Sequence, residues 1–337
     1  MTDHRARTLL RTAERAAYFA AAPALARLPA ALGYRMACWR GDWLFRRETE
    51  KRTEIAGNLQ LVLGNELSPA AAQQVTREYF RLSSCEAIDV KRLRRRARPL
   101  RRLIEIRGRE HLEAALAAGK GAILCTGHFV SLNSAFSVLH ASGFPITSIG
   151  RWWYKYDPGI SSVERRIWEL YLRPVRRHRQ RPNIEPWPGR PQVAALAAAA
   201  LRANEVVTIT IDAPPLDSDR TRAIEVPFLG RRARLLPGAV VLAQVTGAPL
   251  LMGVLYRAAD YRHQVLEISA PVPLGGDTAA AVEGCAAEVS AAIAKRPALW
   301  EPWAKTVDLV DLGLIRDSKT GHQPGLPSVL DEDDARR

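Results

Sequence analysis

The sequence predicts an α/β fold in which a mostly parallel central sheet is flanked by helices. Two observations lead to this prediction: short apolar segments recur along the chain, and segments of helical periodicity separate them. Such alternation is typical of parallel sheets whose strands are joined by helical crossovers. A chain of 337 residues with 47% hydrophobic content is also long and apolar enough to bury a large core.

The expected strands are short segments rich in Val, Ile and Leu, at residues 103–106, 122–125, 146–149, 205–211, 250–256 and 263–269. Helices are expected between and after them, at residues 132–139, 192–203 and 278–295 and from His111 onward. The first strand, the helix from His111 and the second strand predict a β-α-β unit with parallel strands. Residues 173–191 are dense in Arg, Pro and His, which predicts an irregular loop near the site.

The chain before the sheet is predicted to be helical. Residues 48–90 indicate two amphipathic helices, the second with Ser68 as its N-cap. Residues 1–47 combine basic and aromatic side chains, which suits helices lying in a membrane interface, although a helical hairpin packed on the core is the alternative. No apolar run of about 18 residues is present, so a spanning helix is not expected.

These features predict that the chain has three parts. Residues 1–47 are the predicted membrane-interface helices, and residues 48–312 are the predicted α/β domain. Residues 313–337 are rich in Pro, Gly and charge, and we expect them to form a flexible tail.

The charge of the chain points to an acidic partner. Its net charge of +14 favours anionic lipid, an acidic carrier protein or nucleic acid. The basic run at residues 91–109 contains no aromatic side chain for base stacking, so a membrane surface or an acidic carrier is favoured over nucleic acid. A solvated helix face in an Arg-rich protein is the alternative for this run.

The cysteines indicate neither a disulfide framework nor a metal site. They lie far apart, without a CxxC pair, at Cys38, Cys85, Cys125 and Cys285. The sequence also contains no Gly-rich phosphate loop, so we expect no metal and no bound cofactor.

The strongest candidate for chemistry is His128, within the stretch GAILCTGHFVSLN at residues 121–133. It follows a buried strand directly and precedes a helix, and reactive groups in α/β sheets gather at the carboxyl ends of strands. A histidine oriented by a side-chain acceptor can act as a general base. Asn133 is the local candidate for that acceptor, provided that the chain bends between the two residues.

The pattern Gly127-His128-Phe129, followed by Asn133, resembles the His-x4-Asp/Glu block of the lysophospholipid acyltransferase superfamily. The closest branch resembled is that of the bacterial lipid A late acyltransferases and phosphatidylinositol mannoside acyltransferases. This chain departs from the pattern at Asn133, where the family has a carboxylate.

Further blocks of the resemblance follow in the family's order, between residues 50 and 310. An arginine after a strand, an x-Pro and an arginine on the next helix match Arg151, Asp157-Pro158 and Arg165 or Arg166. A strand ending in Asp212 and the segment from Glu225 to Gly230 match the third block, and residues 297–303 resemble the closing aromatic segment.

The resemblance implies roles for these residues. His128 and Asn133 are the implied catalytic pair, and the implied substrate-binding residues are Gly127, Arg151, Arg166, Asp212, Glu225 and Gly230. Arginines suit phosphate or carboxylate groups. A structural salt bridge for Arg151 and a loop cap for Asp212 are the alternatives, and Asp212 is also an alternative carboxylate for His128.

The implied reaction moves a fatty acyl group from acyl carrier protein or acyl-CoA to a hydroxyl or amine of a lipid or glycolipid. The implied location is peripheral, on the cytoplasmic face of the bacterial plasma (inner) membrane. A catalytically silent relative that binds acyl donor or lipid is the alternative, because an amide cannot stabilise an imidazolium as a carboxylate does. The identity of the acceptor and the length of the acyl chain stay open.

Overall fold

The structure is a computed structural model. It describes residues 2–64, 67–93, 98–150, 152, 155, 160–178, 183–186, 192–215 and 217–315.

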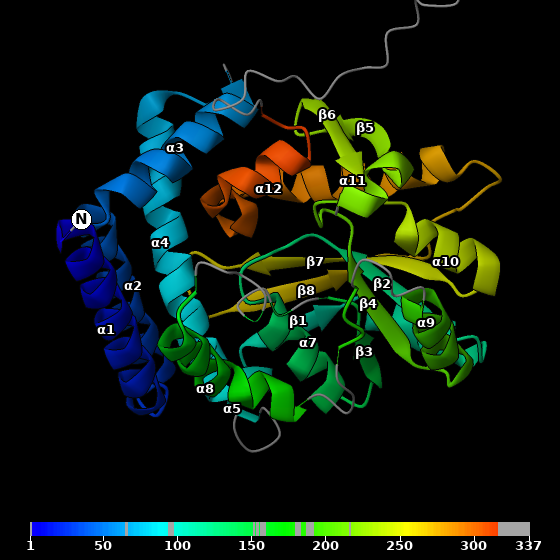
Figure 1. The fold of residues 1–337 in the computed structure, drawn as a ribbon. Helices are drawn as coiled ribbons and strands as arrows, with labels where there is room; N and C mark the ends of the chain where they lie inside the picture. The colour runs from blue at the N-terminus through cyan, green and yellow to red at the C-terminus, as the bar shows by residue number, and fades with distance from the viewer. Residues whose placement is uncertain are drawn as a thin grey trace, which may run out of the picture.

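The N-terminal region folds into four helices: α1 (Thr2–Leu25), α2 (Ala30–Arg47), α3 (Thr49–Leu63) and α4 (Pro69–Arg92). Helix α4 lies between α1 and α2 on one side and the sheet on the other (Figure 1). The predicted N-cap is confirmed, because the Ser68 hydroxyl accepts a hydrogen bond from the Ala71 amide at 3.2 Å. Within the described ranges, no helix is both long and apolar enough to cross a membrane.

The central sheet has six strands in the order β1-β8-β7-β2-β4-β3. Their bounds are β1 (Ile104–Arg107), β2 (Ala122–Thr126), β3 (Ile146–Ser148), β4 (Val206–Thr210), β7 (Leu250–Arg257) and β8 (Gln264–Ile268). Neighbouring strands pair in parallel except β7 with β8. The predicted fold class, a mostly parallel sheet flanked by helices, is therefore confirmed.

The predicted β-α-β unit at the start of the sheet is wrong in one respect. Strand β1 pairs with β8, which is antiparallel to β7, so β1 runs opposite to β2. Helix α6 (Arg109–Ala117) thus returns the chain to the sheet in the reverse direction. Strand β1 lies at the edge of the sheet, with Glu105 and Arg107 exposed, and its direction is set by its pairing with β8, whereas every residue of β2 is buried.

Helices cover the sheet and extend it towards the C-terminus. They are α5 (Arg98–Arg101), α7 (Leu132–Ala141), α8 (Ser162–His178), α9 (Gln192–Arg202), α10 (Gly238–Thr246), α11 (Thr278–Lys295) and α12 (Thr306–Asp311), with 3-10 turns η3 (Asp217–Arg222), η4 (Pro297–Leu299) and η5 (Glu301–Ala304). The loop predicted from Arg173 begins later, because α8 continues through Pro174 to His178. Residues 179–182 and 187–191 of that prediction lie outside the described residues.

A separate antiparallel hairpin, β5 (Ile224–Phe228) and β6 (Arg231–Leu235), packs against α11. Helix α12 and the buried residues Leu314 and Ile315 end the described chain, so packed structure reaches at least to Ile315. The rest of the predicted tail lies outside the described residues.

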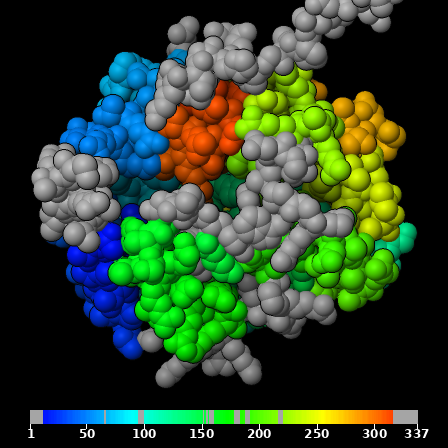
Figure 2. Space-filling model, viewed as in Figure 1, coloured from blue at the N-terminus to red at the C-terminus, as the bar shows by residue number. Residues whose placement is uncertain are grey.

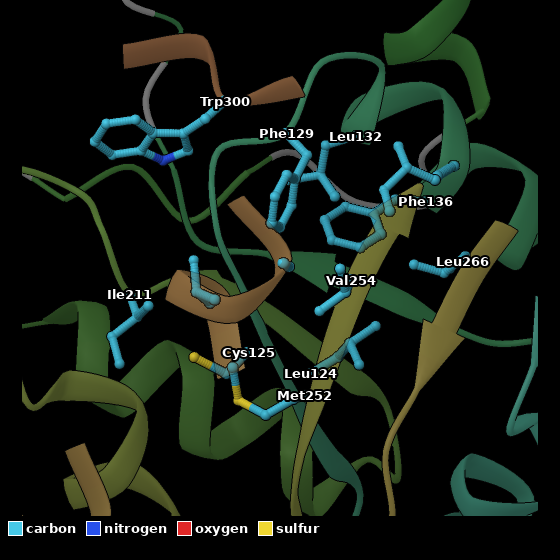
Figure 3. Close-up of a cluster of buried hydrophobic side chains, with 14 of the residues drawn as sticks. Leu124, Cys125, Phe129, Leu132, Phe136, Ile211, Met252, Val254, Leu266 and Trp300 are labelled. Atoms are coloured by element: carbon cyan, nitrogen blue, oxygen red, sulfur yellow. The ribbon is translucent and has the colours of Figure 1, made fainter. Parts of the chain in front are cut away.

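The core lies on both faces of the central strands. In Figure 3, Phe129, Leu132 and Phe136 gather beside Leu124 of β2 and Val254 of β7, and all five side chains are buried. Apolar burial of this kind is the main force holding β2 in place. The turn that follows β2 is consequently attached to the most buried strand of the sheet.

Candidate active site

The register between β2 and β4 brings two predicted site residues together. Thr126, the last residue of β2, lies opposite Thr210, the last residue of β4. His128 and Asp212 each follow two residues later, at the same edge of the sheet. Because the strands are parallel, their carboxyl ends meet at this edge, where sites in α/β sheets are found.

His128 and Asp212 form a hydrogen-bonded pair, which we call the dyad. Nδ1 of His128 lies 2.8 Å from Oδ1 of Asp212. The backbone amide of His128 also donates to Asp212, at 3.1 Å to Oδ1 and 2.8 Å to Oδ2. Asp212 is fully buried, whereas the His128 side chain keeps 34% of its surface exposed, so the imidazole is the accessible member of the dyad.

Trp300 completes the surroundings of the carboxylate. Its indole Nε1 donates to Oδ2 of Asp212 at 2.6 Å, and both side chains are buried. Trp300 was not among the site residues predicted from the sequence. The available signal was general: a buried tryptophan needs an acceptor for its N–H, and residues 297–303 carry two tryptophans.

The electrostatics of the dyad favour an ionised carboxylate beside the imidazole. Burial raises the pKa of Asp212, but His128 and the donated hydrogen bonds outweigh it and hold that pKa below its usual range. Burial lowers the pKa of His128, yet the charge of Asp212, its hydrogen bond to the ring and the charge of Glu301 together outweigh burial, and the pKa of the imidazole lies above its ordinary value. Lys305 opposes the increase.

The hydrogen bonds define the tautomer suited to base chemistry. An ionised Asp212 only accepts, so Nδ1 of His128 carries the hydrogen and Nε2 keeps its lone pair. Nε2 lies 3.4 Å from the Thr210 hydroxyl, near the long limit for a hydrogen bond. The ring is thus oriented to accept a proton at Nε2.

Asn133 does not take the place that its spacing suggested. The hydrogen-bond partner of Nδ1 is Asp212. Asn133 lies on α7, half-buried, and its backbone carbonyl accepts from the Ser137 hydroxyl at 2.8 Å. Any catalytic part for Asn133 stays a prediction.

Gly127 allows the close approach between the turn and the carboxylate. A Cβ at this position would lie 2.7 Å from Cγ1 of Val289 and 3.2 Å from Oδ2 of Asp212. A side chain here would therefore displace Val289 or the dyad. The position therefore requires glycine for steric reasons, whether or not Gly127 makes the substrate contact predicted for it.

The other predicted binding residues lie elsewhere or outside the described part. Arg151 and Asp157-Pro158 are outside the described residues. Arg166 is exposed on α8 and pairs with Glu169 at 3.2 Å, while the exposed Glu225 on β5 pairs with Arg232 at 3.0 Å. Gly230 occupies the hairpin turn with φ of +71°. Substrate contacts by Arg166, Glu225 and Gly230 stay predictions.

The hairpin supports the dyad through its apolar side. The rings of Phe228 and Trp300 lie 5.9 Å apart, and the Leu229 amide donates to the Ser290 hydroxyl at 2.8 Å. Phe129, next to His128, forms a bridge with Trp300. The segment from Glu225 to Gly230 and the closing aromatic segment at residues 297–303 therefore meet at Phe228 and Trp300, and Trp300 bonds Asp212.

The C-terminal turns border the site. The Glu301 amide donates to the carbonyl of His128 at 2.9 Å, and burial raises the pKa of the Glu301 carboxyl. Figure 2 shows that the face of the molecule is hollowed near its centre, beside the orange residues that include η5 and α12. Within the described part of the chain, no group of three or more His, Cys, Asp or Glu side chains is placed to hold a metal ion.

The fold and the dyad define an α/β protein whose site is suited to general-base chemistry. The model of the bacterial lipid A biosynthesis acyltransferase family matches residues 3–303, and the chain therefore belongs to that family. It is also 22% identical over 261 residues to a lipid A biosynthesis acyltransferase of Haemophilus influenzae, a match covering 76% of each chain. The family resemblance of the sequence is confirmed, and with it an acyltransferase class that acts in lipid biosynthesis.

The dyad predicts how the imidazole titrates. Asp212→Asn removes the charge that raises the pKa of His128 while the burial that lowers it persists, so we expect that pKa to fall. The measurement is an NMR titration of the histidine ring, with the signal assigned by its absence in His128→Gln. Asp260→Asn is the matched control, since it removes the exposed carboxylate 2.6 Å from Nδ1 of His263. An unchanged His128 titration in Asp212→Asn would show that the carboxylate does not set this pKa.

Proposed function

We propose that this protein moves a fatty acyl group from an acyl thioester to a hydroxyl or amine of a lipid or glycolipid acceptor, with His128 as the general base. The donor is an acyl group on acyl carrier protein or coenzyme A. The observation that carries the proposal is the buried Asp212 carboxylate holding Nδ1 of an accessible histidine, within the lipid A acyltransferase family.

The proposed chemistry proceeds through a tetrahedral intermediate. Nε2 of His128 takes the proton of the acceptor hydroxyl or amine as its oxygen or nitrogen forms a bond to the thioester carbonyl carbon. Asp212 stabilises the resulting imidazolium through the bond to Nδ1. Collapse of the intermediate breaks the carbon–sulfur bond, and the imidazolium returns the proton to the leaving thiolate.

Stabilisation of the oxyanion is assigned to Arg151 in this proposal. Backbone amides near the turn that carries His128 are the other candidates. The amides of His128, Phe129 and Val130 donate within the protein, to Asp212, the Gly127 carbonyl and the Leu299 carbonyl. They are consequently engaged, which favours a guanidinium donor.

The second candidate is a catalytically silent relative that binds acyl donor or lipid. The observation that favoured this candidate is weaker than the sequence suggested. It rested on Asn133 standing where the family has a carboxylate. Since Asp212 provides a carboxylate to the imidazole, the general-base mechanism does not depend on an acid at position 133. We therefore favour the active enzyme.

The mechanism predicts the effect of removing the base. His128→Ala should reduce thioester consumption by about 10²–10⁴-fold, the usual contribution of general-base catalysis. Activity of the wild type should rise with pH through the His128 pKa, which is above the ordinary value, because only the neutral imidazole accepts a proton. The assay uses acyl carrier protein and coenzyme A donors with a membrane lipid extract.

His263→Ala is the control for this experiment, since His263 is exposed and pairs with Asp260 on the surface. Asn133→Asp tests the departure from the family pattern, and we expect its turnover to equal or exceed that of the wild type. Full turnover by His128→Ala would disprove the mechanism. No turnover by the wild type, together with tight binding of acyl donor or lipid, would establish the silent relative.

We also propose that α2 lies on an anionic membrane surface at the cytoplasmic face of the bacterial plasma membrane. Leu32, Met36 and Trp39 are exposed at spacings of four and three residues, which places them on one face of the helix; Trp39 is 70% exposed. Arg35, Arg46 and Arg47 are exposed on the same helix. An apolar stripe with neighbouring arginines suits a helix lying in a membrane interface.

This proposal predicts a specific loss of membrane binding. Trp39→Ala should weaken binding to vesicles containing phosphatidylglycerol by about tenfold, because a large exposed ring no longer enters the interface. Co-sedimentation measures the binding, with neutral phosphatidylcholine vesicles for comparison. The control is Val245→Ala, an exposed apolar residue on α10, which lies across the molecule from α2 in Figure 1. Equal binding by Trp39→Ala and Val245→Ala would exclude α2 as the contact.

A further inference from the structure

The turn that carries His128 ends at a residue in an unusual conformation. Ser131 has φ of +72°, in the left-handed region that residues other than glycine rarely adopt, and it is fully buried. It is the N-cap residue of α7, so it directs the chain from the turn into the helix. Strained residues of this kind persist where the surrounding contacts hold them, often at functional sites.

A buried set of polar groups holds Ser131. Its hydroxyl donates to Oδ2 of Asp89 at 2.7 Å and accepts from Nη2 of Arg257 at 2.8 Å. Asp89 and Arg257 also pair with each other, and neither side chain has any exposed surface. The Tyr34 hydroxyl donates to Oδ1 of Asp89. We call Tyr34, Asp89, Ser131 and Arg257 the Asp89 cluster.

The Asp89 cluster joins four parts of the fold. Tyr34 comes from α2, Asp89 from α4 and Arg257 from the end of β7, and they meet at the start of α7. Arg257 is fixed further by its Nη1, which donates to the Tyr261 carbonyl at 2.5 Å. Both groups that bond the Ser131 hydroxyl, Asp89 and Arg257, are thus held in place by the surrounding elements.

The location of the cluster indicates more than a contribution to stability. Buried ion pairs often stabilise a fold no better than apolar side chains of similar size. This ion pair bonds Ser131, three residues beyond His128, and the amide and carbonyl of His128 are bonded to Asp212 and to the Glu301 amide. The turn is therefore held at one end by the contacts of His128 and at the other by the Asp89 cluster.

We propose that Ser131 is a positioning residue which, through Asp89 and Arg257, fixes the turn that places the His128 imidazole over its substrate. The inference deepens the proposed function, since it rests on His128 acting as the base there. Catalytic groups need positions accurate to about 0.5 Å, and a misplacement of about 1 Å can cost 10²-fold in rate. A fixed turn of this kind meets that requirement.

The test compares two buried serines at the start of α7, the N-cap Ser131 and Ser134 in the first turn. Ser131→Ala removes the hydroxyl from the Asp89 cluster. Ser134→Ala is the matched control, because Ser134 is equally buried and its hydroxyl has no hydrogen-bond partner among the described residues. We expect Ser131→Ala to reduce kcat about 10- to 100-fold with KM changed less than about threefold, and Ser134→Ala to resemble the wild type.

Two further variants keep the test informative. Ser131→Gly adopts the positive φ without strain but lacks the hydroxyl. A loss of kcat equal to that of Ser131→Ala assigns the effect to the hydroxyl. Recovery of kcat in Ser131→Gly would overturn the positioning role of the hydroxyl. Tyr34→Phe leaves both bonds of the Ser131 hydroxyl intact and removes one from Asp89. A smaller loss of kcat, about two- to fivefold, is expected, and this variant serves if Ser131→Ala fails to fold.

The NMR signal of the His128 ring provides a readout that does not depend on turnover. We expect Ser131→Ala to broaden or shift it and to move its titration midpoint, relative to Ser134→Ala. Unchanged ring signals and unchanged kcat in Ser131→Ala would overturn the positioning role. A changed ring signal in a protein whose wild type consumes no thioester would support the positioning of His128 and disprove the proposed acyl transfer instead.

Discussion

The parallel ladder between β2 and β4 is the constraint on which the site depends. It sets Thr126 opposite Thr210, and His128 and Asp212 each lie two residues beyond that pair. A slip of one residue in this register would send the side chains of one strand to the opposite face. The separation of 84 residues between the two members of the dyad is thus closed by backbone hydrogen bonds.

The buried Asp212 carboxylate in turn requires hydrogen-bond donors, and other segments of the fold must hold those donors in place. A fully buried charge is costly unless donors surround it, and here the donors are the His128 ring, the His128 amide and the Trp300 indole. Trp300 is in turn placed by Phe228 of the hairpin and by its bridge to Phe129. This explains why segments far apart in the sequence are needed for one hydrogen-bonded pair.

Local pattern was sufficient for most elements but not for the pairing of side chains. The helix predicted at residues 278–295 matches α11, and His128 was placed correctly after a buried strand. The acceptor of its Nδ1 was sought five residues away, at Asn133, because a single sequence shows short spacings and not the order of strands. The direction of β1 was missed for the same reason: only its pairing with β8 reveals it.

The two faces of α2 connect the proposed membrane contact to the dyad. Tyr34 points inward to Asp89, while Leu32, Met36 and Trp39 are exposed on the same helix. Two hydrogen bonds, from Tyr34 to Asp89 and from Ser131 to Asp89, separate this helix from the turn that carries His128. Because the Asp89–Arg257 pair is fully desolvated, its geometry is determined by these partners and not by solvent. A helix that lies on the membrane would therefore be joined by these rigid polar contacts to the histidine proposed as the general base.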